Sequence, residues 1–263
     1  MDYEWFHYIE DMKQDGESRT DIKELVQQMR FSVPETKYKQ MKNLIRGMLS
    51  EYRKRGPAEN RFTEELVKLH GQYCQLLPDS ETAKCRHNVM VYRYMLKSPL
   101  SNKAVAFKMG MSVKTVHNYL DKGIEELVIM CFGTPVLSCL SCGQQEKDGI
   151  ENILDNYQLI QISENLNQDF FWSNWKMERS TCIEMTKGAL QGLERLFSLY
   201  EEFAKETALE DYQRRPLEVA KLLYIDGKKD IAEVGDEFGL SLGSVYSDIR
   251  KITERLKELA DTV

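Results

Sequence analysis

Apolar residues recur every three or four positions along almost the whole chain, with charged and polar residues between them. This spacing places the apolar side chains on one face of a helix, and it predicts an all-α protein. A chain of 263 residues is long enough for two domains, each with its own core. The pattern therefore predicts two helical domains.

The clearest local pattern lies in Leu100–Leu127 and predicts two helices joined by a glycine turn. Val105 and Met109 share one face of a short first helix, and Gly110 suits a left-handed exit from it. Ser112 then has the side chain of a helix N-cap. The apolar face of the second helix is expected to hold Val116, Leu120, Ile124 and Leu127. Together these features predict a helix-turn-helix.

The same layout returns 129 residues later. Gly239 corresponds to Gly110, and Ser241 corresponds to Ser112. The apolar positions correspond as well: Val116 with Val245, Leu120 with Ile249 and Leu127 with Leu256. One such pattern also occurs in ordinary helical cores, whereas an internal repeat is hard to produce by composition alone. The repeat predicts that each domain ends in a helix-turn-helix.

The uncharged segment 131–142 marks the expected boundary between the domains, because Gly133 and Pro135 interrupt the helical pattern there. The expected organisation is an N-terminal helical extension (1–34), a basic helix-turn-helix domain (35–130), a linker (131–176) and a second, acidic helix-turn-helix domain (177–263).

Charge is unevenly distributed along the chain, whose net charge is −6. Residues 35–130 hold 17 Lys/Arg and 10 Asp/Glu, a net +7. Residues 143–263 hold 15 and 24, a net −9. The first helix-turn-helix therefore lies in the basic part of the chain, where contacts with DNA phosphates are favoured.

The exposed face of the second helix in each unit is expected to read the DNA major groove, because it carries polar and cationic side chains. The expected DNA-binding residues of the first unit are Lys103, Lys108, Ser112, Lys114, Thr115, His117, Asn118 and Lys122. Those of the second unit are Ser241, Ser244, Tyr246, Ser247, Arg250 and Lys251. Asn118 suits adenine, and Lys114 suits guanine or a phosphate. The alternative for His117 and Asn118 is an ordinary solvated helix face.

Both units resemble the helix-turn-helix of region 4 of bacterial sigma-70 factors and of the related LuxR-type output domains. The residues that carry the resemblance are Val105, Ala106, Gly110, Met111, Ser112 and Val116, and then Val234, Gly239, Leu240, Ser241 and Val245. A long helix before such a motif is also similar to sigma-like activators of phage late genes, including the autolysin-regulator (ArpU) group. The resemblance implies promoter binding and contact with RNA polymerase. No segment resembles sigma region 2, which favours an accessory activator or repressor over a complete sigma factor.

Metal or enzyme chemistry has weak signals in the sequence. Cys139 and Cys142 form a C-x-x-C that supplies half of a zinc site, but no second half follows at a matching spacing. The four histidines show no spacing of a metal pair or of a base beside a nucleophile, and no glycine-rich phosphate loop is present. Acidic pairs such as Glu125-Glu126 suggest exposed helix faces. No cofactor and no catalytic residue is expected.

The leading hypothesis is thus a sequence-specific regulator that binds double-stranded DNA, with two units serving two half-sites or with a homodimer on one operator. The alternative is a protein-interaction module that docks RNA polymerase or another partner without reading bases. No run of 18 uncharged apolar residues occurs, so no membrane partner is expected. The acidic start lacks the features of a secretion signal, which predicts a cytoplasmic protein.

Overall fold

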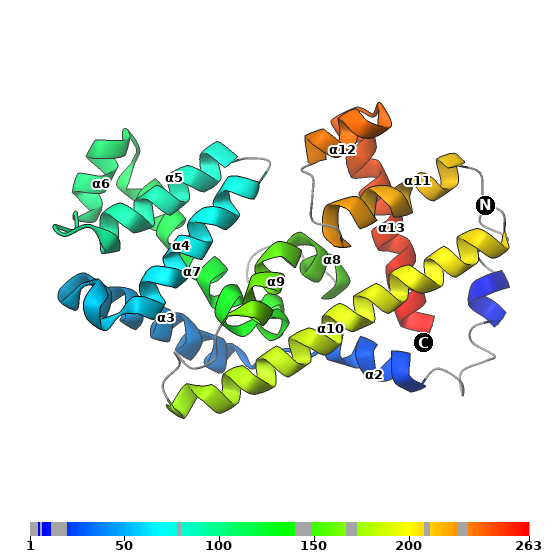
Figure 1. The fold of residues 1–263 in the computed structure, drawn as a ribbon, viewed down its shortest axis with the longest axis horizontal. Helices are drawn as coiled ribbons and strands as arrows, with labels where there is room; N and C mark the ends of the chain where they lie inside the picture. Colours follow the sequence, from blue (N-terminus) through cyan, green and yellow to red (C-terminus); the bar gives the residue numbers. More distant parts are fainter. Residues whose placement is uncertain are drawn as a thin grey trace. The chain divides into compact units, whose positions relative to one another are not determined.

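The structure is a computed structural model, and it describes residues 5, 7–11, 20–77, 80–139, 149–166, 173–207, 211–225 and 231–262. Within these ranges every regular element is a helix, so the predicted all-α class is confirmed (Figure 1). The α-helices are α2 (Thr20–Met29), α3 (Glu35–Arg55), α4 (Arg61–Leu76), α5 (Ser80–Met90), α6 (Asn102–Met109), α7 (Val113–Phe132), α8 (Gly149–Asp155), α9 (Tyr157–Asn165), α10 (Ser173–Glu206), α11 (Asp211–Ala220), α12 (Ile231–Phe238) and α13 (Leu242–Thr262). No helix in the described ranges combines the length and apolar composition that a membrane crossing requires.

The chain forms two compact units that differ from the expected division at 34, 130 and 176. Unit 1 comprises Met1–Phe31, Gly143–Gln158 and Glu184–Val263, and unit 2 comprises Ser32–Cys142 and Leu159–Ile183. The N-terminal segment joins unit 1 because α2 packs on α8, and α8 packs on α13. Apolar faces that are distant in the sequence bury each other in this way, which local composition does not reveal.

The segment expected to be a linker, 131–176, contains packed helices. Cys131 and Phe132 belong to the buried end of α7. A short 3₁₀ helix, η3 (Thr134–Cys139), buries Val136 and Leu137 immediately afterwards. The helices α8 and α9 also lie in this segment. The absence of charge in 131–139 thus reflects burial in unit 2.

Helix α7 is the central element of unit 2. Helices α3, α4, α5 and α6 all pack against it. Its final turns are apolar on every side, and each residue from Leu127 to Phe132 is 0% exposed. A helix that is apolar all round is stable only when it is surrounded by other elements. The first turns of α7 carry polar residues instead, and they lie toward the surface.

The helices before the two predicted motifs end in the same unusual way. Helix α5 continues into a π-helical turn, Val91–Met95, and α11 continues into another, Lys221–Ile225. Such turns are rare and occur mostly as single bulges. Their positions are related by nearly the spacing of the sequence repeat. The repeat therefore extends to backbone geometry outside the helix-turn-helix segments.

The second predicted helix-turn-helix, formed by α12 and α13, lies in compact unit 1 and has a core of its own there. Val219, Leu223, Val234 and Val245 are its buried centre. Six partly buried residues surround them: Leu222, Tyr224, Ile231, Phe238, Leu240 and Ile249. The sequence pattern had assigned Val245 and Ile249 to this apolar face, and both lie in or against the core.

Candidate functional site

The turn between α6 and α7 has the predicted geometry. Gly110 adopts φ 64° and ψ 30°, a left-handed conformation that favours glycine. The amide of Met111 donates to the carbonyl of Ala106 at 3.0 Å and closes the end of α6. Ser112 then caps α7, and its Oγ accepts from the amide of Thr115 at 3.0 Å. Gly110 and Ser112 therefore have the roles that the sequence predicted.

The turn between α12 and α13 repeats these contacts at the corresponding residues. Gly239 has φ 62°. The amide of Leu240 donates to the carbonyl of Gly235 at 2.7 Å, as Met111 does to Ala106. The Oγ of Ser241 accepts from the amide of Ser244 at 3.2 Å, as Ser112 does from Thr115. Two segments 129 residues apart thus form the same turn with the same hydrogen bonds.

The expected DNA-binding residues of the first helix-turn-helix unit, which belongs to compact unit 2, lie at the surface of α6 and the first turns of α7. Lys103, Lys108, Ser112, Lys114, His117, Asn118 and Lys122 are exposed, and Thr115 is half-buried. Two of these side chains are held by neighbours. The Nε2 of His117 lies 3.2 Å from Nδ2 of Asn102, and the Lys108 ammonium lies 4.6 Å from the centre of the Tyr92 ring. The structure therefore brings these residues onto one pair of helices.

The corresponding residues of the second helix-turn-helix unit, which belongs to compact unit 1, are also at the surface, but their positive charges have acidic neighbours. Ser241, Tyr246, Ser247, Arg250 and Lys251 are exposed, and Ser244 is half-buried. Arg250 pairs with Glu254 at 3.5 Å, and Lys251 lies 3.9 Å from the buried carboxylate of Asp248. In the first unit Lys103, Lys114 and Lys122 form no ion pair with any other described residue. The first unit therefore presents more unneutralised positive charge.

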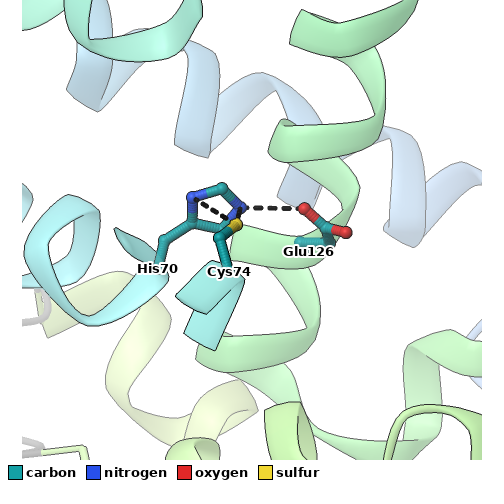
Figure 2. Close-up of side chains that lie close together, drawn as sticks. All are labelled: His70, Cys74 and Glu126. Carbon is teal, nitrogen blue, oxygen red and sulfur yellow. Dashed lines mark hydrogen bonds and ion pairs between the residues drawn. The ribbon is translucent and has the colours of Figure 1, made fainter. Parts of the chain in front are cut away.

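A buried polar cluster lies in the interior of unit 2. It joins His70 and Cys74 of α4 to Glu126 of α7 (Figure 2). Both His70 and Cys74 are 0% exposed, and Glu126 is 2% exposed. Two residues of α5 complete the cluster. Arg86 donates to both carboxylate oxygens of Glu126 at 2.8 Å, and Nδ1 of His87 lies 3.2 Å from Nδ1 of His70.

The hydrogen bonds of this cluster assign the tautomers of both histidines. The Nε2 of His70 lies 2.8 Å from Oε2 of Glu126, so this nitrogen carries the proton and donates to the carboxylate. When His70 is neutral, its Nδ1 is an acceptor, and the Nδ1–H of His87 donates to it. In that state the chain of donors runs from His87 through His70 to Glu126, whose carboxylate also accepts from Arg86.

Burial and charge shift the pKa values in this cluster in opposite directions. Burial opposes ionisation of Glu126, but its contacts with His70 and Arg86 outweigh burial and hold the pKa of Glu126 below its usual value. Burial, and then the nearby His70, lower the pKa of His87 to about 4. Burial raises the pKa of the Cys74 thiol to about 12. A protonated and fully buried thiol is a weak nucleophile.

One sequence interpretation is wrong at this cluster, and one contact in it was not visible from the sequence. The Glu125-Glu126 pair was expected to be an exposed helix face, but Glu126 points into the interior while Glu125 pairs with Lys42 at 3.0 Å. The histidines show no spacing of a metal pair in the sequence, but the packing of α4 against α5 brings His70 and His87 together. The one local signal was the spacing of His70 and Cys74, since residues four apart share a helix face.

The predicted half-site for zinc, Cys139 and Cys142, is only partly described. The Sγ of Cys139 lies 3.3 Å from the carbonyl oxygen of Val33 and donates a hydrogen bond to it. Cys142 lies outside the described residues. The group of possible metal ligands that the described ranges do bring together is His70, Cys74 and Glu126.

Comparison of the chain with protein-family models, with curated proteins and with solved structures finds no match.

Proposed function

We propose that this chain is a sequence-specific DNA-binding transcriptional regulator with two helix-turn-helix units similar to sigma region 4. The observation that carries the proposal is the repeated turn: the same left-handed glycine, the same closing hydrogen bond and the same serine cap occur in both units. Each turn leaves the first turns of the following helix at the surface with polar side chains. A recognition helix meets base edges through its N-terminal residues.

In the proposed complex the first turns of α7 lie in the major groove. Lys114, Thr115, His117 and Asn118 contact base edges, and Lys103, Lys108 and Lys122 contact phosphates. An Asn side chain can pair with adenine through two hydrogen bonds, which is worth about 1–3 kcal/mol of discrimination. Asn102 lies beside His117 and would orient its ring toward the groove.

The two units differ enough to have unequal roles in this proposal. The first unit supplies most of the affinity, because Lys103, Lys114 and Lys122 form no ion pair with any other described residue and residues 35–130 are net positive. The second unit is a weaker DNA contact, since Arg250 and Lys251 already face carboxylates. A specific observation favours a second candidate role for it, docking of a protein such as RNA polymerase. Leu242 and Tyr246 are four residues apart on one helix and are 53% and 57% exposed.

The test is a selection of bound duplexes from a random pool with the full purified chain, followed by affinity measurements over a range of salt concentrations. The double variant Lys114→Ala/Asn118→Ala should weaken binding to the selected duplex by about 1–3 kcal/mol and relax the preferred sequence. If Lys114 contacts a phosphate, the slope of log K against log[salt] should also fall by about one.

The chain offers a matched control in the variant Lys187→Ala/Gln191→Ala. It removes one lysine and one amide side chain at the same four-residue spacing from an exposed face of α10. The control should bind like the wild type. A selection that enriches no motif would refute base readout, and equal losses in both double variants would refute the assignment to α7. The variant Leu242→Ala should keep its DNA affinity while losing RNA polymerase capture if the second unit docks protein.

A further inference from the structure

The buried cluster of unit 2 has a ligand set and spacing that suit a transition metal. The Nε2 of His70, the Sγ of Cys74 and a carboxylate oxygen of Glu126 all lie within 4.8 Å of one another. The distance between Cys74 Sγ and His70 Nε2 is 3.7 Å, and that between His70 Nε2 and Glu126 Oε2 is 2.8 Å. A tetrahedral zinc ion separates a nitrogen and a sulfur ligand by about 3.6 Å, and nitrogen and oxygen ligands by about 3.3 Å. Binding would open the nitrogen–oxygen pair by about 0.5 Å and leave the nitrogen–sulfur pair almost unchanged.

The scaffold already places these three side chains without help from a loop. His70 and Cys74 are four residues apart on α4 and share one face of it. Glu126 reaches them from α7, which packs directly against α4. The combination of imidazole, thiolate and carboxylate favours zinc over the hard cations magnesium and calcium, which prefer oxygen ligands alone.

The surrounding residues would orient the ligands as outer partners do in metal sites. His87 lies against the Nδ1 of His70, and Arg86 holds both carboxylate oxygens of Glu126 at 2.8 Å. Gly71 lets the His87 ring approach α4, because a Cβ at position 71 would lie 2.8 Å from two of its ring atoms. His87 and Arg86 therefore hold the His70 ring and the Glu126 carboxylate in place.

We propose that His70, Cys74 and Glu126 form a buried zinc site that links α4 to α7, with a fourth position open to a water molecule. On binding, the Cys74 thiol loses its proton to solvent. The proton of His70 moves from Nε2 to Nδ1 and is donated to Nδ1 of His87, whose own proton moves to Nε2. Both histidines stay neutral, and one proton is released for each zinc ion bound. The alternative is that the cluster binds no metal and keeps the hydrogen-bond network described above.

The experiment uses the full chain, stripped with a chelator and then titrated with Zn²⁺ or Co²⁺. The proposal expects about one tightly bound metal per chain, retained through gel filtration, and a cobalt spectrum with a thiolate charge-transfer band. Cys74→Ser should abolish that band, and the matched control Cys85→Ser, a half-buried cysteine on α5, should keep it. His87→Ala should weaken zinc binding by about 10–100-fold. Circular dichroism of each metal-free variant shows whether it remains folded.

Several outcomes would overturn the proposal. One is a folded, stripped wild-type chain that gives no thiolate band with cobalt. Another is a band that survives Cys74→Ser but disappears in Cys139→Ser/Cys142→Ser, which would assign the metal to that pair. If Cys74→Ser does not fold, the metal affinity is measured for His70→Ala and His87→Ala instead. Unchanged metal binding in both variants would equally refute the site. None of these results depends on whether the chain binds DNA.

Discussion

The buried ion pair between Arg86 and Glu126 allows a quantitative prediction. Replacing Glu126 by leucine removes the acceptor for the Arg86 guanidinium and for the Nε2–H of His70. The side chains of Arg86 and Glu126 are 11% and 3% exposed, so water cannot replace the lost carboxylate. The variant therefore leaves a largely buried cation and a buried N–H donor without their partner.

The magnitude follows from the cost of an uncompensated buried charge. Removing one partner of such a pair destabilises a protein by about 3–5 kcal/mol. Replacing both partners by apolar residues of similar volume is often neutral or stabilising by about 1–4 kcal/mol. The single variant Glu126→Leu should therefore lower the free energy of unfolding by about 3–5 kcal/mol, and Arg86→Met/Glu126→Leu should recover most of this loss.

The assay is urea denaturation of the metal-free chain, followed by circular dichroism in the presence of a chelator. The neighbouring residue supplies a matched control, since Glu125 lies on the same helix and pairs with Lys42 at 3.0 Å, with 25% of its side chain exposed. Glu125→Leu should cost about 1 kcal/mol or less, because water screens a partly exposed pair.

Two results would contradict this reasoning. Equal losses for Glu125→Leu and Glu126→Leu would mean that Glu126 is not an uncompensated buried partner. A double variant with Arg86→Met that is less stable than Glu126→Leu alone would mean that the cation is not the source of the cost. If the single variant does not fold, recovery of folding by the double variant still tests the same point.

Two further predictions concern the turns and the acid stability of unit 2. Gly110→Ala and Gly239→Ala should each destabilise the chain by about 1–2 kcal/mol in thermal or urea unfolding, because both glycines have a left-handed φ. The control Gly47→Ala lies at an exposed helical position with open space and should stabilise the chain by about 0.5–1 kcal/mol. Destabilisation by Gly47→Ala together with stabilisation by the two turn variants would contradict the turn geometry. Folding holds the pKa of His87 at about 4, below its unfolded value of about 6.5, so the stability that neutral His87 contributes is present above pH 6.5 and is lost as the pH falls toward 4. The free energy of unfolding should fall by up to about 1.4 kcal/mol per pH unit over this range. His87→Gln should flatten the dependence of stability on pH between 6.5 and 4, and an unchanged dependence would count against burial of a neutral His87.

Much of the local structure was decided by the sequence, because its signals act over a few residues. Gly110 and Gly239 could be assigned left-handed turns since few other residues adopt that conformation without strain. The serine caps followed from the chemistry of a hydroxyl beside unpaired amides. The all-α class followed from apolar spacing along the chain. The repeat itself was visible as matching residues 129 positions apart.

The tertiary structure alone decided which distant segments pack together and which polar residues are buried. Glu125 and Glu126 are chemically identical neighbours, and only the packing of α4 and α5 around α7 makes one half-exposed and the other buried. The same packing joins His70 to His87 and assigns α2 to the unit that contains α13. Burial depends on the sum of contacts from all neighbouring helices, and these contacts link residues far apart in the chain. Periodicity reports which face of a helix is apolar, but not which other helix will cover it.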